Sequence, residues 1–195
     1  MDYTDLTCKS ISINYRIYNK QEEKTKNDYL REMITEVLDW GLKPKKVTTD
    51  TWYSSKENLK FLKNKQLGFL TGIAKNRSCS VDGKNFTQVQ KLEIPDSGLI
   101  VYLKKFGQVK VFRRNFKNET SRYYIMYTPE KDALSSIFRT EFRELHSIHW
   151  GIECYHRAIK QVCGIGQFMV RATEAIRTHF EERNSSFHSI RINAL

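Results

Sequence analysis

The first part of the chain alternates between two patterns of apolar and polar residues. Residues 11–18 (ISINYRIY) alternate at period two, which predicts a strand with one covered face. From Asn27 onward apolar residues recur every three or four positions, which predicts an amphipathic helix capped by Asn27 and ended by Gly41. Residues 46–50 are short and β-branched, so they indicate the next strand, with Asp50 at its carboxyl end.

This alternation continues to residue 74. Residues 54–57 (SSKE) have the form of a capping box, and the helix that they open is expected to run to Gly68. The apolar run 68–73 then predicts a buried strand. Strands that alternate with helices in this way are typical of an α/β domain with a mostly parallel or mixed sheet.

Residues 75–128 follow a different pattern, in which short β-rich runs are separated by turn sequences such as Asp82-Gly83. We expect an antiparallel meander inserted in the α/β domain, with strands at 86–92, 99–103, 109–112 and 123–127.

Beyond Pro129 the period returns to that of a helix. An apolar stripe leads into a helix that we expect to continue to Val162, and it consists of Leu134, Ile137, Phe138, Phe142 and Leu145. A short amphipathic piece follows at 172–180, and the polar tail has no periodicity. The predicted organisation is therefore 1–74 (first part of the core), 75–128 (basic β-rich insertion), 129–183 (helical part of the core) and 184–195 (loose tail).

Composition narrows the class of protein. A chain of 195 residues, 39% hydrophobic, can bury one core with a sizeable insertion. Its 33 Lys and Arg exceed its 22 Asp and Glu, and the net charge of +11 favours a polyanionic partner, first nucleic acid and second an anionic membrane surface. No apolar run is long enough to span a membrane and the start does not resemble a signal peptide, so we expect a soluble intracellular protein without a membrane partner.

The four cysteines give no metal motif. Cys8, Cys79, Cys154 and Cys163 are widely scattered without a C-x-x-C pair, so reduced cysteines are favoured over a zinc site.

The positive charge is concentrated in the insertion. Residues 75–128 hold eleven Lys and Arg against four Asp and Glu, a net +7 of the total +11. Two basic pairs interleaved with phenylalanines are suited to DNA phosphates, namely Lys104 with Lys105 and Arg113 with Arg114. The alternative is a solvated face of the sheet.

The segment 149–160 places one acid among bases at helical spacing. His149, Glu153, His156 and Lys160 form one stripe of a helix, which indicates a carboxylate facing a cleft. The alternative is an exposed ion pair between Glu153 and Arg157, four residues later.

Asp50 and Glu153 are the two candidate metal ligands. Ligands of open α/β sheets bind at the carboxyl ends of strands, where Asp50 lies, although an aspartate there is also a common cap. Carboxylates from separate elements suit Mg²⁺, and the matching chemistry is two-metal phosphoryl transfer, in which Lys160 would hold a phosphate.

Two parts of the sequence resemble a known family. Residues 47–55 (VTTDTWYSS) and Glu153, followed after six residues by Lys160, resemble the DDE transposases of bacterial insertion sequences, in the branch with a β-rich insertion before the final Glu. The resemblance extends from about residue 14 to about residue 177 and includes the segments 40–44 and 156–160.

This resemblance implies a ribonuclease H-like fold, with Asp50 as the second catalytic acid and Glu153 as the third. It implies Mg²⁺-dependent strand cleavage and transfer at transposon ends, association between copies of the chain and a cytoplasmic location at the bacterial nucleoid. The DNA contacts expected around Glu153 are His149, His156, Arg157 and Lys160.

The sequence departs from the family pattern at three places. The Tyr and Arg positions of the signature Tyr-x-x-Arg-x-x-x-Glu are held by His146 and His149. The first acid is not found, since neither Asp2 nor Asp5 precedes the right strand, and the polar tail differs from the expected apolar helix. We therefore expect a transposase catalytic domain truncated at the N-terminus and inactive alone; the alternatives are a non-catalytic DNA-binding remnant that modulates intact transposase and an unrelated basic nuclease.

Overall fold

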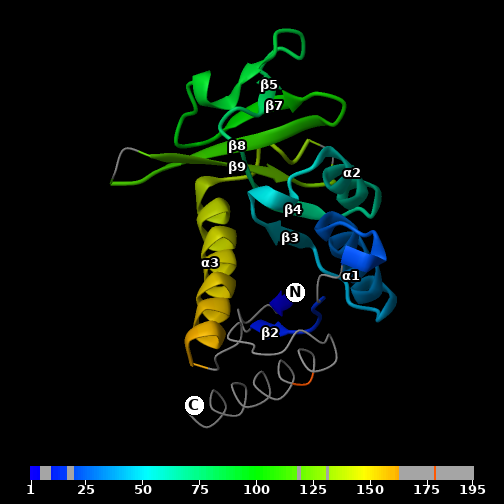
Figure 1. The fold of residues 1–195 in the computed structure, drawn as a ribbon. Coiled ribbons are helices and arrows are strands. Elements are labelled where there is room, and N and C mark those ends of the chain that lie inside the picture. The colour runs from blue at the N-terminus through cyan, green and yellow to red at the C-terminus, as the bar shows by residue number, and fades with distance from the viewer. Residues whose placement is uncertain (5–9, 17–19, 118–119, 131, 163–177, 179–195) are drawn as a thin grey trace. The chain divides into compact units, whose positions relative to one another are not determined.

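The structure is a computed structural model, and it describes residues 1–4, 10–16, 20–117, 120–130, 132–162 and 178 (Figure 1). The chain divides into two compact units. One comprises residues 24–147, and the other combines residues 1–23 with residues 148–195. Each unit is described by itself below.

The described residues of the 24–147 unit form a seven-stranded mixed sheet. Its order is β3-β4-β9-β8-β7-β5-β6. β3 and β4 are parallel, whereas the other described pairs are antiparallel. The strand bounds are β3 Lys46–Thr49, β4 Gly68–Ile73, β5 Ser78–Ser80, β6 Thr87–Gln88, β7 Leu99–Leu103, β8 Gly107–Asn115 and β9 Ser121–Tyr127.

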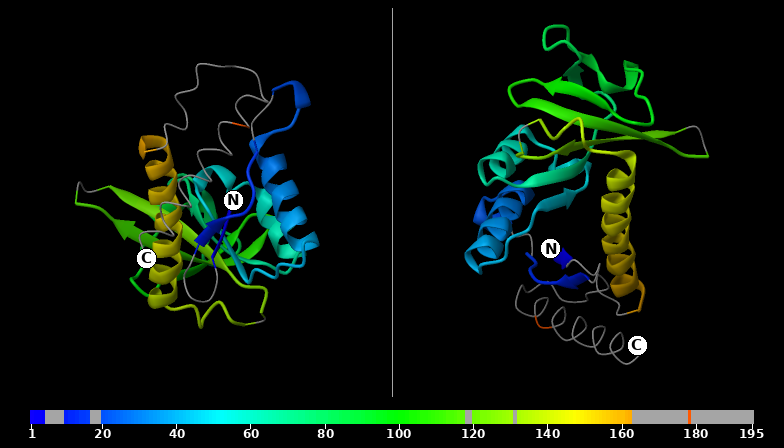
Figure 2. Two further views of the ribbon diagram at one scale, coloured as in Figure 1. Left: turned by 90° about the horizontal axis from the view of Figure 1, so that it is seen from below. Right: turned by 180° about the vertical axis from the view of Figure 1, so that it is seen from behind.

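Helices cover both faces of this sheet. α1 (Lys26–Asp39) and α2 (Lys56–Asn64) lie together on one side of β3 and β4, and the first turns of α3 (Arg139–Val162) lie on the other (Figures 1 and 2). Two 3-10 turns, η2 (Thr51–Tyr53) and η3 (Val89–Lys91), interrupt the connections. The predicted α/β class with a mixed sheet and flanking helices is confirmed.

The core beneath α3 joins three strands to the start of that helix. It is a buried cluster of Leu70, Phe112, Tyr124, Met126, Ile137 and Phe142. The rings of Phe112 and Phe142 stack with their centroids 4.8 Å apart. An ion pair between Lys46 of β3 and Glu141 of α3 adds a polar tie at the edge of the sheet. Side chains of β4, β8 and β9 that alternate with this set, such as Thr71 and Ile125, are buried on the opposite face.

The other unit contains a short hairpin of β1 (Asp2–Thr4) and β2 (Ser10–Ser12), together with residues 148–162 of α3. The strand predicted at 11–18 is shorter than expected, because pairing ends at Ser12. The amides of Ile13 and Asn14 both donate to the carbonyl of Met1, at 3.0 and 3.3 Å, where the partner strand ends. Residues 17–19 lie outside the described residues, as do the predicted amphipathic piece at 172–180, apart from residue 178, and the tail.

Two predicted helix starts were wrong by one or two residues. α1 is capped by Thr25, which forms a reciprocal capping box with Asp28, and not by Asn27. α2 is capped by Ser55, whose hydroxyl accepts from the amide of Asn58, because the Ser54 hydroxyl bonds to the carbonyl of Thr51. α2 also ends at Asn64, earlier than the predicted Gly68.

The antiparallel meander of the insertion is confirmed, with differences in its strands. β8 extends over nine residues, and the run 86–92 divides into β6 and η3. β5 was not predicted, since Ser78–Ser80 has no apolar alternation. The helix expected from Leu134 begins only at Arg139, and Phe138 of the predicted apolar stripe is 68% exposed.

Candidate active site

Asp50 lies at the carboxyl end of β3, where the chain turns into η2. Its side chain is both a cap and an exposed group, because Oδ1 accepts from the amide of Trp52 at 2.9 Å while the residue remains exposed. Its backbone carbonyl accepts from the hydroxyl of Thr71 on β4 at 3.1 Å. Asp50 is therefore at once the cap of η2 and an exposed carboxylate at the end of β3.

Close backbone packing holds η2 above β4. A Cβ added at Gly72 would lie 2.5 Å from Oγ1 and 3.1 Å from the amide nitrogen of Thr51. Such contacts are too short for a side chain, so glycine at position 72 allows Thr51 to lie directly against the strand. This packing helps to fix the turn that carries Asp50.

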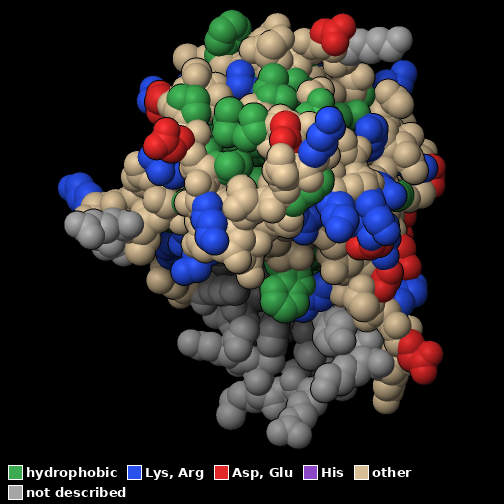
Figure 3. All heavy atoms as spheres, turned by 90° about the horizontal axis from the view of Figure 1, so that it is seen from above, with side chains coloured by type: hydrophobic (Ala, Val, Ile, Leu, Met, Phe, Trp, Pro, Cys, Tyr) green, Lys and Arg blue, Asp and Glu red, His purple; other side chains and the backbone are tan. Residues whose placement is uncertain are grey.

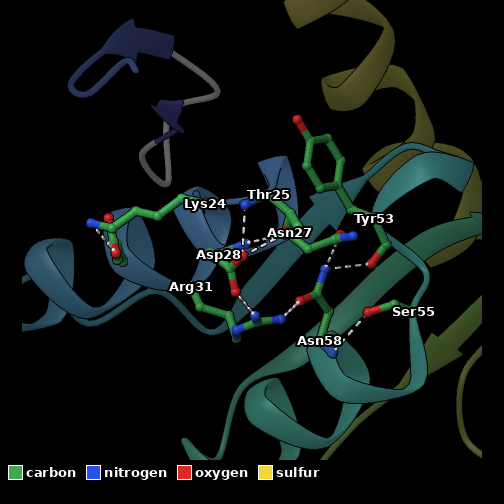
Figure 4. Close-up of polar contacts among 9 residues, drawn as sticks. Lys24, Thr25, Asn27, Asp28, Arg31, Tyr53, Ser55 and Asn58 are labelled. Atoms are coloured by element: carbon green, nitrogen blue, oxygen red, sulfur yellow. Dashed lines mark hydrogen bonds and ion pairs between the residues drawn. The ribbon is translucent and has the colours of Figure 1, made fainter. Parts of the chain in front are cut away.

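A buried asparagine fixes η2 from the other side (Figure 4). Asn58 of α2 is 1% exposed, and its amide donates to the Tyr53 carbonyl at 3.1 Å and to Asn27 Oδ1 at 2.8 Å. Its oxygen accepts from Arg31 at 2.6 Å, and Arg31 is also paired with Asp28. α1, α2 and η2 are thus joined through one side chain, in which both the amide nitrogen and the oxygen form hydrogen bonds.

The register of the sheet brings arginines to the same end as Asp50. Thr49 is paired with Thr71, Thr71 with Ile125, and Ile125 with Val111. Arg122 lies three residues from Ile125 on β9, and Arg114 lies three residues from Val111 on β8. Both steps run in the direction in which β3 ends. With strands about 4.8 Å apart, β9 lies about 10 Å and β8 about 14 Å from β3.

Arg114 and Arg122 form a cationic pair across the β8–β9 hairpin. They are direct cross-strand partners, both are exposed, and each guanidinium lies 5.2 Å from the ring centroid of Phe116. Like charges directly opposite one another on a sheet repel, so an anion between them would stabilise the pair. We call Arg113, Arg114 and Arg122 the arginine end.

Contacts with α3 show which face these side chains share. Lys46 contacts Glu141 of α3, so alternation along β3 directs Asp50 toward the same side. On β8, Arg114 lies 3.0 Å from Nδ1 of His146 on α3. Asp50 and Arg114 therefore share a face as well as an end of the sheet, whereas the side chain of Arg113 points to the opposite face.

His146 links α3 to β9 as well as to β8. It is 9% exposed, and its Nε2 lies 3.1 Å from the hydroxyl of Tyr124. The imidazole also packs edge-on against the Tyr124 ring. The histidine at the Tyr position of the signature is thus a packing residue that positions Arg114.

Lys104 and Lys105 lie at the other end of the sheet. They connect β7 to β8 and are exposed, with Lys105 at φ +62°. The seven steps along β8 from Gly107 to Arg114 separate the two basic pairs by about 24 Å. Phe106 and Phe112, which lie between these cations in the sequence, are buried and serve the core.

A space-filling view from above shows one face of the molecule (Figure 3). Lys and Arg side chains surround hydrophobic ones on that face and do not merge into a single patch. The insertion thus presents its positive charge in more than one place.

Glu153 lies on the part of α3 that belongs to the other unit. Its exposed carboxylate lies 3.6 Å from Nε2 of His149, and Nδ1 of that ring is buried without a hydrogen-bond partner among the described residues. Arg157 lies over the ring of Trp150 at 5.7 Å, so the alternative ion pair between Glu153 and Arg157 is not the one observed. The side chains of His156 and Lys160 lie outside the described residues, although both positions are helical.

No group of three or more His, Cys, Asp or Glu side chains that could hold a metal occurs within the described part of the chain. The described cysteines, buried Cys79 and exposed Cys154, are free thiols, and burial raises the pKa of Cys79. Asp50 suits a hard cation as one ligand, because it is an exposed carboxylate whose described hydrogen bond uses Oδ1.

Comparison with known protein families matches residues 7–184 to the transposase DDE domain. The chain belongs to this family. Searches among curated proteins and among solved structures found no match. The mixed sheet with flanking helices agrees with the ribonuclease H-like fold of DDE transposases, and such transposases generally use a divalent metal ion. Where the structure is described, no helix combines the length and the apolar character needed to cross a bilayer.

Four residues of this transposase domain were missed by sequence reasoning as parts of the site. Arg122 had a usable signal, because extending the pairing of the predicted hairpin strands places it opposite Arg114. Thr71, Gly72 and Asn58 had none, since each acts through a partner that only the folded chain supplies.

Proposed function

We propose that this transposase domain acts in DNA transposition by cleaving and joining strands at the ends of a bacterial insertion sequence. One observation carries the proposal most strongly: Asp50 is exposed at the end of β3, on the same end and face of the sheet as Arg114 and Arg122. A carboxylate beside exposed guanidinium groups is the surface that a phosphodiester bound with a cation requires.

Asp50 and Glu153 would hold the divalent ion, with Mg²⁺ as the expected cofactor. When bound, the metal would activate a water or the 3′ hydroxyl of the DNA for attack and would stabilise the leaving oxygen. The protein positions the DNA. Arg114 and Arg122 would bind phosphates near Asp50, and Arg113 would bind a phosphate on the opposite face at the same end. Lys104 and Lys105 would bind the duplex farther away, and His149, His156, Arg157 and Lys160 would contact DNA beside Glu153.

In this arrangement the Lys and Arg side chains bind DNA phosphates and do not recognise bases. Lys and Arg that neutralise phosphates release counterions, so binding must weaken steeply as salt rises. Cleavage and joining at an insertion sequence also require its two DNA ends to be held together. This favours an assembly of several copies of the chain. We place this activity in the cytoplasm, at the nucleoid.

A second candidate is a DNA-binding chain without catalysis that competes with intact transposase. The observation that favours it is the set of exposed cations, Lys104, Lys105, Arg114 and Arg122, which can bind DNA phosphates without a metal. The first acid of the family pattern, which the sequence does not show, points in the same direction. We therefore expect no Mg²⁺-dependent nicking by this chain alone.

One experiment separates these proposals. The protein is incubated with transposon-end DNA and Mg²⁺, and both binding and nicking are measured for the parent, Asp50→Ala and Glu153→Ala. Salt-sensitive binding without nicking that is unchanged in both variants would support the non-catalytic chain. Binding without nicking that Mg²⁺ strengthens, and that loses this Mg²⁺ effect in both variants, would support a catalytic domain that is inactive alone. Nicking that both variants abolish would establish catalysis and contradict inactivity alone, whereas no binding at low salt would refute both proposals.

A further inference from the structure

An exposed tryptophan lies beside the candidate catalytic acid. Trp52 is 69% exposed, and its backbone amide donates to Asp50 Oδ1 at 2.9 Å. We propose that Trp52 and Lys26 form a stacking site for an unpaired DNA base next to the phosphate presented to Asp50. This inference rests on the proposed function and specifies the form of its DNA substrate.

The tryptophan is held on a rigid turn. The amide of Tyr53 donates to the Asp50 carbonyl at 3.3 Å, and the Tyr53 carbonyl accepts from buried Asn58 at 3.1 Å. Gly72 lets the other end of η2 pack directly on β4. Each end of the three-residue turn is therefore fixed, and an indole on such a turn loses little further freedom when a ligand binds.

Lys26 completes the site with a cation. It is the first residue of α1, and its Nζ lies 5.8 Å from the centroid of the Trp52 ring. This ammonium group interacts with one side of the indole and remains exposed, so it is available to a phosphate. An aromatic ring beside a cation is the combination by which proteins bind single-stranded nucleic acid.

The position of Trp52 determines which form of DNA fits. A phosphodiester near Asp50 carries its base within reach of the neighbouring indole. Inside a duplex both faces of that base are covered by its neighbours, so its π-face is not available. Stacking on Trp52 therefore selects a base in a single-stranded extension or one turned out of the helix.

The same helix provides a matched control. Trp40 is the C-cap residue of α1 and is 56% exposed, but it lies about 20 Å from Lys26 along the 14-residue helix. A tryptophan that is exposed merely because surfaces carry some apolar residues should behave as Trp40 does. The chain has three tryptophans, so substituting two of them leaves one fluorescent reporter.

The test compares Trp40→Phe/Trp150→Phe, which keeps Trp52, with Trp52→Phe/Trp150→Phe, which keeps Trp40. Each is titrated with a duplex that has a single-stranded 3′ extension, with the blunt duplex, and with heparin as a polyanion without bases. We expect quenching of Trp52 by the extended duplex, little quenching by the other two, and no quenching of Trp40. In otherwise native protein, Trp52→Ala should weaken binding of the extended duplex by about 5- to 150-fold and leave blunt-duplex binding nearly unchanged.

Other outcomes overturn the inference in distinguishable ways. If the parent binds DNA with salt dependence, but the fluorescence of Trp52 does not change and Trp52→Ala does not weaken binding, stacking is refuted and the proposed function stands. Equal quenching by heparin would assign the signal to charge alone. A change in self-association of Trp52→Ala with unchanged DNA affinity would assign the indole to a protein contact, and failure of the parent to bind any DNA would refute the proposed function as well.

Discussion

The hydroxyl of Thr71 donates to the backbone carbonyl of Asp50 at 3.1 Å, from a side chain that is 1% exposed. The same oxygen lies 2.7 Å from Oγ1 of Thr49, the register partner of Thr71 on β3. A buried hydroxyl on one strand thus fixes the last step of its neighbour before the chain turns. It positions the candidate acid without touching its carboxylate.

Replacing Thr71 by Val should loosen this turn. The substitution keeps the shape but leaves the Thr49 hydroxyl without its partner and the Asp50 carbonyl with only the amide of Tyr53, at a cost of about 1–3 kcal/mol in the free energy of unfolding. Urea unfolding measures the loss, and amide hydrogen exchange at Trp52 should become faster. Thr71→Ser, which keeps the hydroxyl, is the control. Slow exchange in Thr71→Val would show that this bond does not hold the turn.

Asn58 should be among the most sensitive polar positions of the 24–147 unit. Asn58→Ala removes the partners of Arg31, Asn27 and the Tyr53 carbonyl together, so we expect destabilisation of about 2–3 kcal/mol. Asn64→Ala, at the exposed end of the same helix, should change stability by less than about 0.5 kcal/mol. Thermal or urea unfolding of the two variants checks this. Similar losses in both would indicate that the network contributes nothing specific.

The separation of the basic residues predicts a dependence on DNA length. A hairpin duplex of about six base pairs is about 20 Å long and cannot reach from the arginine end to Lys104 and Lys105. Arg122→Ala should therefore weaken binding of both short and long duplexes, whereas Lys104→Ala should weaken only the long one. Each lost phosphate contact should reduce the slope of log affinity against log salt by about 0.9.

Anisotropy titrations at several salt concentrations measure this effect. Lys91→Ala removes an exposed cation elsewhere in the insertion and serves as the control. A stronger effect of Lys104→Ala than of Arg122→Ala on the short duplex would contradict the assignment of the arginine end to the site.

The pKa of Tyr53 reports the charge of Asp50. Burial raises the pKa of Tyr53, and the neighbouring Asp50 carboxylate raises it further. The unfolded chain therefore ionises this phenol at lower pH than the folded chain does. Its contribution to stability is lost as pH rises from the ordinary tyrosine value of about 10 toward the folded value.

Asp50→Asn should lower the pKa of Tyr53 without restoring its ordinary value, because the effect of burial remains. An NMR titration with ¹³C-labelled tyrosine measures the shift, and Tyr53→Phe assigns the signal. An unchanged pKa in Asp50→Asn would show that the carboxylate does not face the ring.

Local patterns predicted the strands that are rich in apolar or β-branched residues. β3, β4 and β7 lie within a residue of their expected bounds, because a buried or half-buried strand must be apolar or β-branched whatever its neighbours are. Gly41, at φ +82°, follows the end of α1 as predicted, since that backbone conformation favours glycine. The caps were less predictable. Asn27 has capping chemistry but bonds to Asn58, which folding brings to it, and the Ser54 hydroxyl bonds to the carbonyl of Thr51 in the preceding turn.

The sequence by itself determined the α/β class, the antiparallel insertion, the excess of positive charge and Asp50 as a candidate acid at a strand end. These follow from residue types and periods that act within a few positions. Only the tertiary structure decided that Arg114 and Arg122 share an end and a face with Asp50, whereas Lys104 and Lys105 lie about 24 Å away along β8. The physical reason is strand register, since hydrogen bonds between distant segments, and not distance along the chain, set which side chains meet at one end of a sheet.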